Sequence, residues 1–264
     1  MTPEPLSTEE LAAAGLRYDV DGVVATITLA RPDVHNAQTP RMWRAMGRLG
    51  GQLPDDVRVV VVRGEGASFS AGLDRAMLDP TADTGEESVA GLLGRTDAEI
   101  VDTIGAYQEG FTFLRDPRFV SVAVVQGHAI GAGFQLALSC DLRILADDAR
   151  LSMKESALGL VPDLTGTKPL VEAVGYGRAL EICVTARTVR ADEAATLGLA
   201  QAVVPTDRVD ATLADLVAAL TTAPHGAVVE TKALLQQAAA NDLDQQRLTE
   251  RTAQVRRFRA VAGG

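Results

Sequence analysis

The hydrophobic pattern near the start of the chain predicts a hairpin followed by a helix. Two apolar runs at 16–20 and 23–29 flank Asp21-Gly22, a pair that favours a type I′ turn between two strands. Thr39-Pro40 then predicts a helix start, with Thr39 as N-cap and Pro40 at the first helical position. Gly50-Gly51 predicts the end of that helix after Leu49.

Two continuous apolar runs, at 57–62 and 121–125, predict strands that are buried on both faces. A glycine-containing loop follows each of them, and the second loop leads into a helix from about Ala132 to Leu138. Residues 75–95 show little periodicity and predict a mobile loop with weak helical pieces. The other predicted elements are an amphipathic helix at 97–114 and short strands at 142–145, near Leu151 and at 202–204.

The last third of the chain changes to mostly helical periodicity from Thr167 onward. The pattern predicts a helix capped by Thr206. The apolar stripe of that helix and the helices at 225–258 are expected to bury apolar area between subunits. The stripe consists of Val209, Leu213, Leu216 and Leu220. These patterns divide the chain into a tail at 1–14, a core at 15–205 and a helical oligomerisation region at 206–264.

Composition excludes several classes of protein. Of the 264 residues, 47% are hydrophobic and 23% are charged, which is typical of a globular domain. The net charge of −10 argues against a nucleic-acid partner. Residues 1–10 lack the features of a secretory signal, and no run reaches the roughly 18 apolar residues of a membrane helix. Cys140 and Cys183 indicate reduced, buried thiols, so we expect a cytoplasmic protein without a membrane partner. We expect no metal site, because His35, His128 and His225 stand far apart with no cysteine pair near them.

The two glycine-containing loops are the candidate sites of chemistry. They lie at 69–74 and 127–135, each after the carboxyl end of a buried strand, where α/β folds place ligands. A helix N-terminus offers unpaired N–H donors, so two such turns side by side could hold one oxyanion. The alternative is that the glycines only form tight turns. Motifs for dinucleotides, for P-loop nucleotide binding and for serine hydrolases are absent.

Four ordered segments resemble a known family. Ile-Thr-Leu-Ala-Arg-Pro-Asp-Val-His-Asn-Ala at 27–37 resembles the opening signature of the crotonase (enoyl-CoA hydratase/isomerase) superfamily. Residues 60–74 and 125–141 resemble its two oxyanion-hole segments, and Gly-Leu-Val-Pro at 159–162 resembles the segment after its catalytic turn. The resemblance covers roughly residues 17–205 in consistent order.

The resemblance implies an α/β fold, a spiral of ββα turns with a helical C-terminal trimerisation region. It implies an acyl-CoA thioester as substrate, with coenzyme A entering as part of that substrate and no separate cofactor. A homotrimer or a dimer of trimers is expected. The backbone N–H groups of Leu73 and Ala132 fall at the places of the two oxyanion donors. The residues at the places of coenzyme A contacts are His35, Ala37, Ala71 and Asp74.

The acidic residues bear on which reaction is catalysed. The hydratases of this family carry two glutamates, but this chain has Gln135 at the first place and Glu155 at the second. An amide cannot exchange protons at neutral pH, so the pair that activates water is incomplete. Asp163, eight residues after Glu155, resembles the second acid of dienoyl-CoA isomerases. We therefore favour double-bond isomerisation, with hydration through Glu155 as one alternative and a non-catalytic acyl-CoA-binding protein as another.

Each candidate also has a structural interpretation. Glu155 could be an acid in the first turn of a helix, where carboxylates are favoured. Asp163 follows Pro162, so a turn or N-cap role is equally natural. Gln135 could be a polar pocket residue that orients a water molecule or Glu155. Trp43 and His128 are expected to be structural.

Overall fold

A six-stranded sheet forms the centre of the computed structural model, which describes residues 5–79, 81 and 88–263. The strand order is β1-β2-β3-β4-β6-β9; β1 and β2 are antiparallel, and the other neighbours are parallel. The strands are β1 (Leu16–Asp21), β2 (Val24–Leu29), β3 (Val59–Gly64), β4 (Val120–Val125), β6 (Leu142–Ala146) and β9 (Ala202–Val204). The strands expected from the apolar runs are therefore confirmed.

The hairpin between β1 and β2 is present, but its turn differs from the expected one. Asp21 pairs with Val24 in the strand register, so the two loop residues are Gly22 and Val23. Gly22 has a φ of 55°, whereas Val23 does not have a positive φ. A positive φ at the first central residue alone belongs to a type II′ turn, and the type I′ expectation was wrong because Asp21 remains in the ladder.

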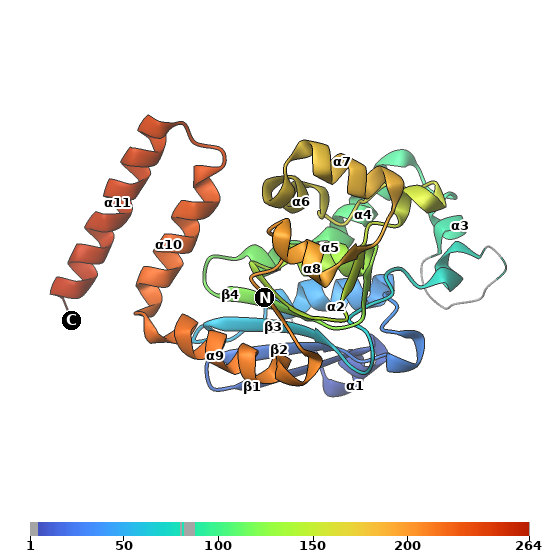
Figure 1. Cartoon of the computed structure of the whole chain (residues 1–264), viewed down its shortest axis with the longest axis horizontal. Coiled ribbons are helices and arrows are strands. Elements are labelled where there is room, and N and C mark those ends of the chain that lie inside the picture. Colours follow the sequence, from blue (N-terminus) through green and yellow to red (C-terminus); the bar gives the residue numbers. More distant parts are fainter. Residues whose placement is uncertain (1–4, 80, 82–87, 264) are drawn as a thin grey trace.

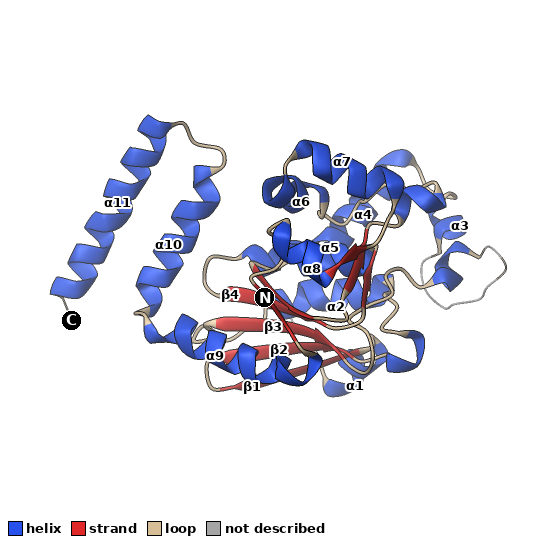
Figure 2. Ribbon diagram, viewed as in Figure 1, coloured by secondary structure: helices blue, strands red, loops and turns tan. Residues whose placement is uncertain are grey.

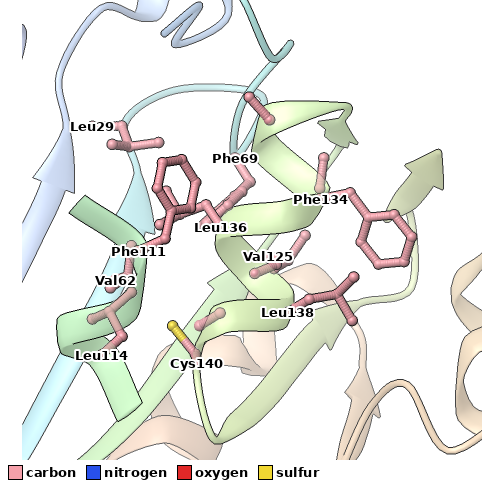
Figure 3. Close-up of a cluster of buried hydrophobic side chains, with 14 of the residues drawn as sticks. Leu29, Val62, Phe69, Phe111, Leu114, Val125, Phe134, Leu136, Leu138 and Cys140 are labelled. Carbon is pink, nitrogen blue, oxygen red and sulfur yellow. The ribbon is translucent and has the colours of Figure 1, made fainter. Parts of the chain in front are cut away.

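The valines of β3 face two separate cores. Val60 and Val62 pack into the larger core, while Val59 and Val61 pack into a smaller one on the opposite face of the sheet. Burial on both faces, as the continuous β-branched run predicts, is confirmed. Figure 3 shows part of the larger core, where aromatic and aliphatic side chains from several elements surround one short helix.

That short helix is α5 (Ala132–Ser139), and all eight of its residues are buried. A helix that is apolar on every side belongs in the interior of a domain. Around it lie α2 (Pro40–Gly50) and α4 (Asp97–Thr112), which pack closely against each other. Thr39 caps α2 as predicted, since its hydroxyl accepts a hydrogen bond from the N–H of Met42 at 3.3 Å.

Smaller elements surround the main sheet. A second sheet joins β5 (His128–Ile130), β7 (Arg150–Ser152) and β8 (Val189–Arg190) in that order. The strand β5 is missing from the sequence expectation because glycines at both ends mask its short pattern. Of the expected loop at 75–95, a 3₁₀ turn at Arg75–Leu78 and the helix α3 (Val89–Leu92) are present, and residues 80 and 82–87 lie outside the described residues. The remaining short elements are α1 (Thr8–Ala13) and 3₁₀ turns at Pro32–Val34 and Phe113–Arg115.

The helix α9 (Val209–Thr222) covers the sheet of its own chain. Its apolar stripe packs against β3, β4 and β6, with Val209 fully within that smaller core. Leu213, Leu216 and Leu220 are only partly buried by this packing, and the expected burial of the stripe between subunits stays a prediction. The capping expectation was wrong, because Thr206 begins a 3₁₀ turn (Thr206–Arg208) and Arg208 is the N-cap of α9.

The C-terminal helices α10 (His225–Ala238) and α11 (Leu243–Ala262) form an antiparallel pair that projects from one side of the body (Figures 1 and 2). The buried Lys232 ties α10 to the body. Its Nζ donates to the carbonyls of Asp116 and Phe119 and to the carboxylate of Asp141, each at 2.7 Å. Between β7 of the second sheet and the last strand, β9, the chain forms shorter helices, α6 (Thr167–Val174), α7 (Tyr176–Thr185) and α8 (Ala191–Thr196); α6 and α7 pack against each other, away from α9 (Figure 1).

Over the described ranges, no single helix has both the length and the apolar character to cross a membrane. The segments 206–222 and 225–238 together meet a test of length and composition, but they are bent by 100° with respect to each other.

Candidate active site

The two glycine-containing loops lie side by side and are joined by backbone hydrogen bonds. The N–H of Ser70 donates to the carbonyl of His128 at 2.8 Å, and the N–H of Ile130 donates to the carbonyl of Ser70 at 3.0 Å. The loop after β3 thus extends along the short strand β5. This pairing fixes the approach of the loop to the N-terminus of α5.

Gly72 brings the two candidate donors together. Its φ is +85°, and a Cβ at this position would overlap the carbonyl oxygen of Ile130 and lie 3.4 Å from the nitrogen of Ala132. Leu73 follows directly, so its N–H lies close to that of Ala132 at the first position of α5. Within the described residues, neither N–H donates a hydrogen bond to the protein. Two free donors at a helix N-terminus can hold one anionic oxygen.

A buried polar network supports the first of these loops. The hydroxyl of Ser70 accepts from the N–H of Gly72 at 3.1 Å and from Nε2 of Gln38 at 3.0 Å, and it donates to the carbonyl of Asn36 at 2.8 Å. Trp43 completes the network, because its Nε1 donates to Oε1 of Gln38 at 2.8 Å. The expected structural role of Trp43 is confirmed. Gln38 and Ser70 did not emerge from the sequence, because no local pattern marks a contact across 32 residues.

Glu155 lies against the N-terminus of α5. It begins the 3₁₀ turn Glu155–Leu158, its side chain is buried, and a Cβ placed on Gly131 would be 3.2 Å from its Oε1. Burial raises the pKa of the Glu155 carboxyl above its ordinary value. The backbone N–H of Glu155 itself and a hydrogen bond from Gln135 lower this pKa, and the charge of Asp163 raises it. A carboxyl with a raised pKa beside an oxyanion site is suited to proton transfer.

Gln135 contacts Glu155 directly. Its Nε2 donates to Oε1 of Glu155 at 2.7 Å, and its own Oε1 accepts from the N–H groups of Leu164 and Gly166 at 2.9 Å and 3.2 Å. Of the two structural interpretations of Gln135, the structure contains the contact with Glu155 that the second one requires, and the role itself stays a prediction. The two residues are 20 positions apart, and the buried helix α5 brings them into contact.

Asp163 lies on the turn whose N–H groups donate to Gln135, and it is exposed at the surface of the single chain. Many protein atoms nevertheless surround its carboxyl, and this partial desolvation raises its pKa. Gly166, and not Asp163, is the N-cap of α6, so the capping alternative for Asp163 was wrong. Between the two acids, Leu160 and Val161 expose apolar side chains. The carbonyl of Asp163 also accepts a hydrogen bond from Gln108 at 2.6 Å, a contact that the sequence did not suggest.

The four residues predicted to contact coenzyme A, His35, Ala37, Ala71 and Asp74, are linked in pairs by hydrogen bonds around the loop at 69–74. The N–H of Ala71 donates to the carbonyl of His35 at 2.8 Å. One guanidinium, that of Arg31, joins the carbonyl of Ala37 at 2.6 Å to the carboxylate of Asp74 at 2.9 Å. The carboxylate of Asp74 also accepts from the N–H of residue 76, so it has intramolecular partners. A cavity of about 290 Å³ adjoins it, lined by Ala13, Ala14, Arg31, Thr39, Asp74, Ala76 and Met77.

The two cysteines and the side chains that commonly bind metals supply no further reactive group to the site. Burial raises the pKa of the Cys140 thiol to about 12, which keeps it protonated. Cys183 is only partly buried, unlike the expectation for both thiols, and it lies near Glu155. Across residues 5–79, 81 and 88–263, no three His, Cys, Asp or Glu side chains group in a way that could hold a metal ion.

Solved structures of other proteins share this fold. A crystal structure of a candidate enoyl-CoA hydratase from Thermobifida fusca, in complex with acetoacetyl-CoA, superposes with a TM-score of 0.93 at 54% identity, covering 96% of this chain and 98% of that one. A structure of a candidate enoyl-CoA hydratase from the same organism, in complex with CoA, gives 0.94 at 53% identity over the full length of both chains.

Sequence comparisons agree with these structures. A probable enoyl-CoA hydratase of Mycobacterium bovis is 32% identical over 190 residues, which is 71% of this chain and 67% of that protein. A peroxisomal Δ(3,5)-Δ(2,4)-dienoyl-CoA isomerase of Arabidopsis thaliana is 30% identical over 201 residues, or 75% and 70% of the two chains. The family model for enoyl-CoA hydratase/isomerase matches residues 19–261. As its sequence motifs predict, the chain belongs to the enoyl-CoA hydratase/isomerase family of enzymes and has the fold of the crotonase superfamily.

Proposed function

We propose that the protein acts on acyl-CoA thioesters and moves a proton on the carbon chain beside the thioester. The observation that carries this proposal is the packing of Gly72 against the N-terminus of α5, between the unpaired N–H groups of Leu73 and Ala132, with the buried carboxyl of Glu155 next to Gly131. A thioester oxygen that accepts hydrogen bonds from both N–H groups gains negative charge when the carbon beside the carbonyl loses a proton. The two donors stabilise that charge, and Glu155 takes the proton.

The preferred reaction is isomerisation of a carbon–carbon double bond. The carboxylate of Glu155 removes one proton, and the electron pair spreads over the chain to the thioester oxygen. Asp163 then returns a proton at a different carbon, so the double bond moves and the number of protons is conserved. The raised pKa of each carboxyl favours this exchange near neutral pH. Gln135 supports isomerisation over hydration, because an amide cannot share the activation of a water molecule with Glu155.

Hydration of a 2-enoyl thioester is the second candidate. The names of several relatives favour it, among them the Mycobacterium bovis protein and a short-chain-enoyl-CoA hydratase of Clostridium acetobutylicum, which is 33% identical over 187 residues. In that reaction Glu155 alone would activate the water and protonate the adjacent carbon. The Arabidopsis isomerase supports the first candidate.

The remaining features of the proposal follow from the substrate. Coenzyme A enters as part of the thioester, and the reaction draws on no separate cofactor. The crystal structures of the Thermobifida fusca protein, with acetoacetyl-CoA and with CoA, support this substrate class. His35, Ala37, Ala71, Asp74 and Gln135 are proposed to line the substrate site. We further propose a cytoplasmic homotrimer or dimer of trimers without a nucleic-acid or membrane partner.

A panel of three thioesters separates the two reactions. The purified protein is incubated with a 2-enoyl, a 3-enoyl and a 3,5-dienoyl thioester, and the products are identified by mass and by ultraviolet absorbance. Isomerisation predicts shifted double bonds without a mass change, and Asp163→Asn should slow it by about 10²-fold or more. A hydrated product that Asp163→Asn leaves unaffected would instead assign the protein as a hydratase that uses Glu155 alone.

A further inference from the structure

The side-chain amide of Gln135 has partners at both ends, and these partners fix its orientation. Its Oε1 accepts from two backbone N–H groups, those of Leu164 and Gly166, while its Nε2 donates to Oε1 of Glu155. The side chain is fully buried. A reversed amide would place its NH₂ group against two donors and its oxygen against a carboxylate. Only one orientation therefore satisfies the site.

This orientation makes the two oxygens of Glu155 unequal. Oε1 lies 2.7 Å from the amide nitrogen, so a proton on Oε1 would point at another donor. Oε2 is buried and, within the described residues, has no hydrogen-bond partner. A buried polar atom without a hydrogen-bond partner is unusual in a native protein, and such atoms occur at sites where chemistry takes place. This geometry favours Oε2 over Oε1 as the atom that carries the proton when Glu155 is protonated.

The same amide also holds the turn that carries Asp163. Thr165, between the two donating residues, has a φ of +69°, an uncommon conformation for a β-branched residue. Gly166 sits directly on Gln135, and a Cβ there would lie 2.6 Å from its Cγ. The turn therefore keeps its shape only against a side chain that offers an oxygen to both N–H groups. One side chain thus connects the two candidate acids.

We propose that Gln135 is a positioning residue that reserves Oε2 of Glu155 as the proton-exchanging oxygen and holds the turn of Asp163 at a fixed place beside it. The role in catalysis rests on the proposed function, whereas the control over the Glu155 carboxyl does not. A glutamate at position 135 could not do the same, because its second oxygen would face Oε1 of Glu155. Two carboxylate oxygens about 2.7 Å apart, the distance between the Gln135 amide nitrogen and Oε1 of Glu155, require a shared proton.

In the part of the chain that the structure describes, no cation is among the groups that shift the pKa of Glu155. The titratable side chains that face it are Asp163 and, from α7, Cys183. Lys154 precedes it, but the ammonium group of Lys154 donates to the carbonyl of Ala186. The hydrogen bond from Gln135 is therefore the main side-chain contact that favours the carboxylate form.

Infrared difference spectroscopy of the full-length protein tests the proposal without requiring turnover. The carbonyl stretch of the protonated Glu155 carboxyl is followed against pH and is assigned by its loss in Glu155→Gln. Gln135→Met keeps the length of the side chain but removes its hydrogen bonds. Its Glu155 titration should move to higher pH by about one unit, the scale of a charge-assisted hydrogen bond. The matched control is Ser139→Ala.

Ser139 suits this control because it lies on the same helix and contacts the same turn. Its hydroxyl donates to the backbone carbonyl of Gln135 and lies 3.5 Å from the side-chain hydroxyl of Thr165, but among the described contacts it has none with Glu155. The control should titrate as the wild type does. An equal shift in Ser139→Ala and Gln135→Met would overturn the proposal, because loosening of the turn alone would then explain it. So would a wild-type titration in Gln135→Met.

A second variant keeps the test decisive if Gln135→Met does not fold. Gln135→Glu retains an acceptor for the turn and should add a second titration step above that of the wild type, from the proton shared with Glu155. A single, unshifted step would contradict the proposal. In turnover assays, both variants should lower kcat and shift its pH dependence more than they change KM. If the wild type shows no turnover, the proposed function fails while the infrared titration still decides the role of Gln135.

Discussion

Replacing Gly72 with alanine should disrupt the candidate oxyanion site while leaving the fold intact. Alanine in a left-handed backbone conformation costs about 1–2 kcal/mol, and the new Cβ would overlap the carbonyl oxygen of Ile130. The loop must then retreat from α5 by a distance on the order of 1 Å, and a displacement of that size can cost about 10²-fold in rate. The N–H of Leu73 moves with it. Loss of one oxyanion donor lowers kcat by about 10²–10³-fold.

The assay is steady-state turnover of the best thioester from the panel, with thermal unfolding measured in parallel. Gly105→Ala is the matched control: Gly105 lies in α4, and a Cβ there meets nothing within 4 Å. That control should keep wild-type kcat and gain about 0.5–1 kcal/mol in stability, since alanine favours helix interiors over glycine. A folded Gly72→Ala protein with wild-type kcat would refute the reasoning, because the oxygen would then not be held between the two loops.

Three further predictions address other parts of the account. Ala132→Pro removes the second donor, and kcat should fall by about 10²–10³-fold in a variant that still binds coenzyme A, whereas full activity in that variant would exclude Ala132 as a donor. Lys232→Met leaves the Asp141 carboxylate without its cation and should destabilise the protein to urea by about 3 kcal/mol, so an unchanged midpoint would contradict the anchoring of α10. Burial raises the pKa of Glu155 in the folded protein above its ordinary value of 4.5. Below pH 4.5 the carboxyl is protonated in both the folded and the unfolded protein and costs no stability. As the pH rises from 4.5 through the raised pKa, the unfolded protein loses this proton more readily, and the folded protein becomes less stable. Glu155→Gln should therefore gain melting temperature relative to the wild type as the pH rises above 4.5, and a pH-independent difference would contradict the raised pKa.

Sequence patterns predicted the parts of the molecule that depend on local composition. The valine-rich runs identified β3 and β4, because only a strand buried on both faces tolerates such continuous hydrophobicity. The glycines after them marked the two loops that the structure brings together. Gln135 and Glu155 were chosen through the family resemblance, and the structure brings them into direct contact.

Other features depend on contacts between distant segments, which periodicity does not encode. The Gln38–Ser70 network joins two loops through buried polar groups that look like ordinary loop residues in the sequence. The stripe on α9 was predicted to be buried, but periodicity did not show that it packs against the sheet of the same chain. Likewise, the turn at Gly22 depends on where the strand register begins, and one residue of register changes the turn type.

The most direct test of the account is the exchange of solvent deuterium into the acyl chain of a bound thioester. The wild type and Glu155→Gln are incubated with an enoyl thioester in heavy water, and incorporation beside the thioester is followed by mass spectrometry. Glutamine at position 155 can keep the hydrogen bond from Gln135 but cannot carry the proton. The account predicts incorporation by the wild type and a rate at least about 10²-fold lower in the variant. Equal rates in the two proteins, or no incorporation by a wild type that binds the thioester, would contradict it.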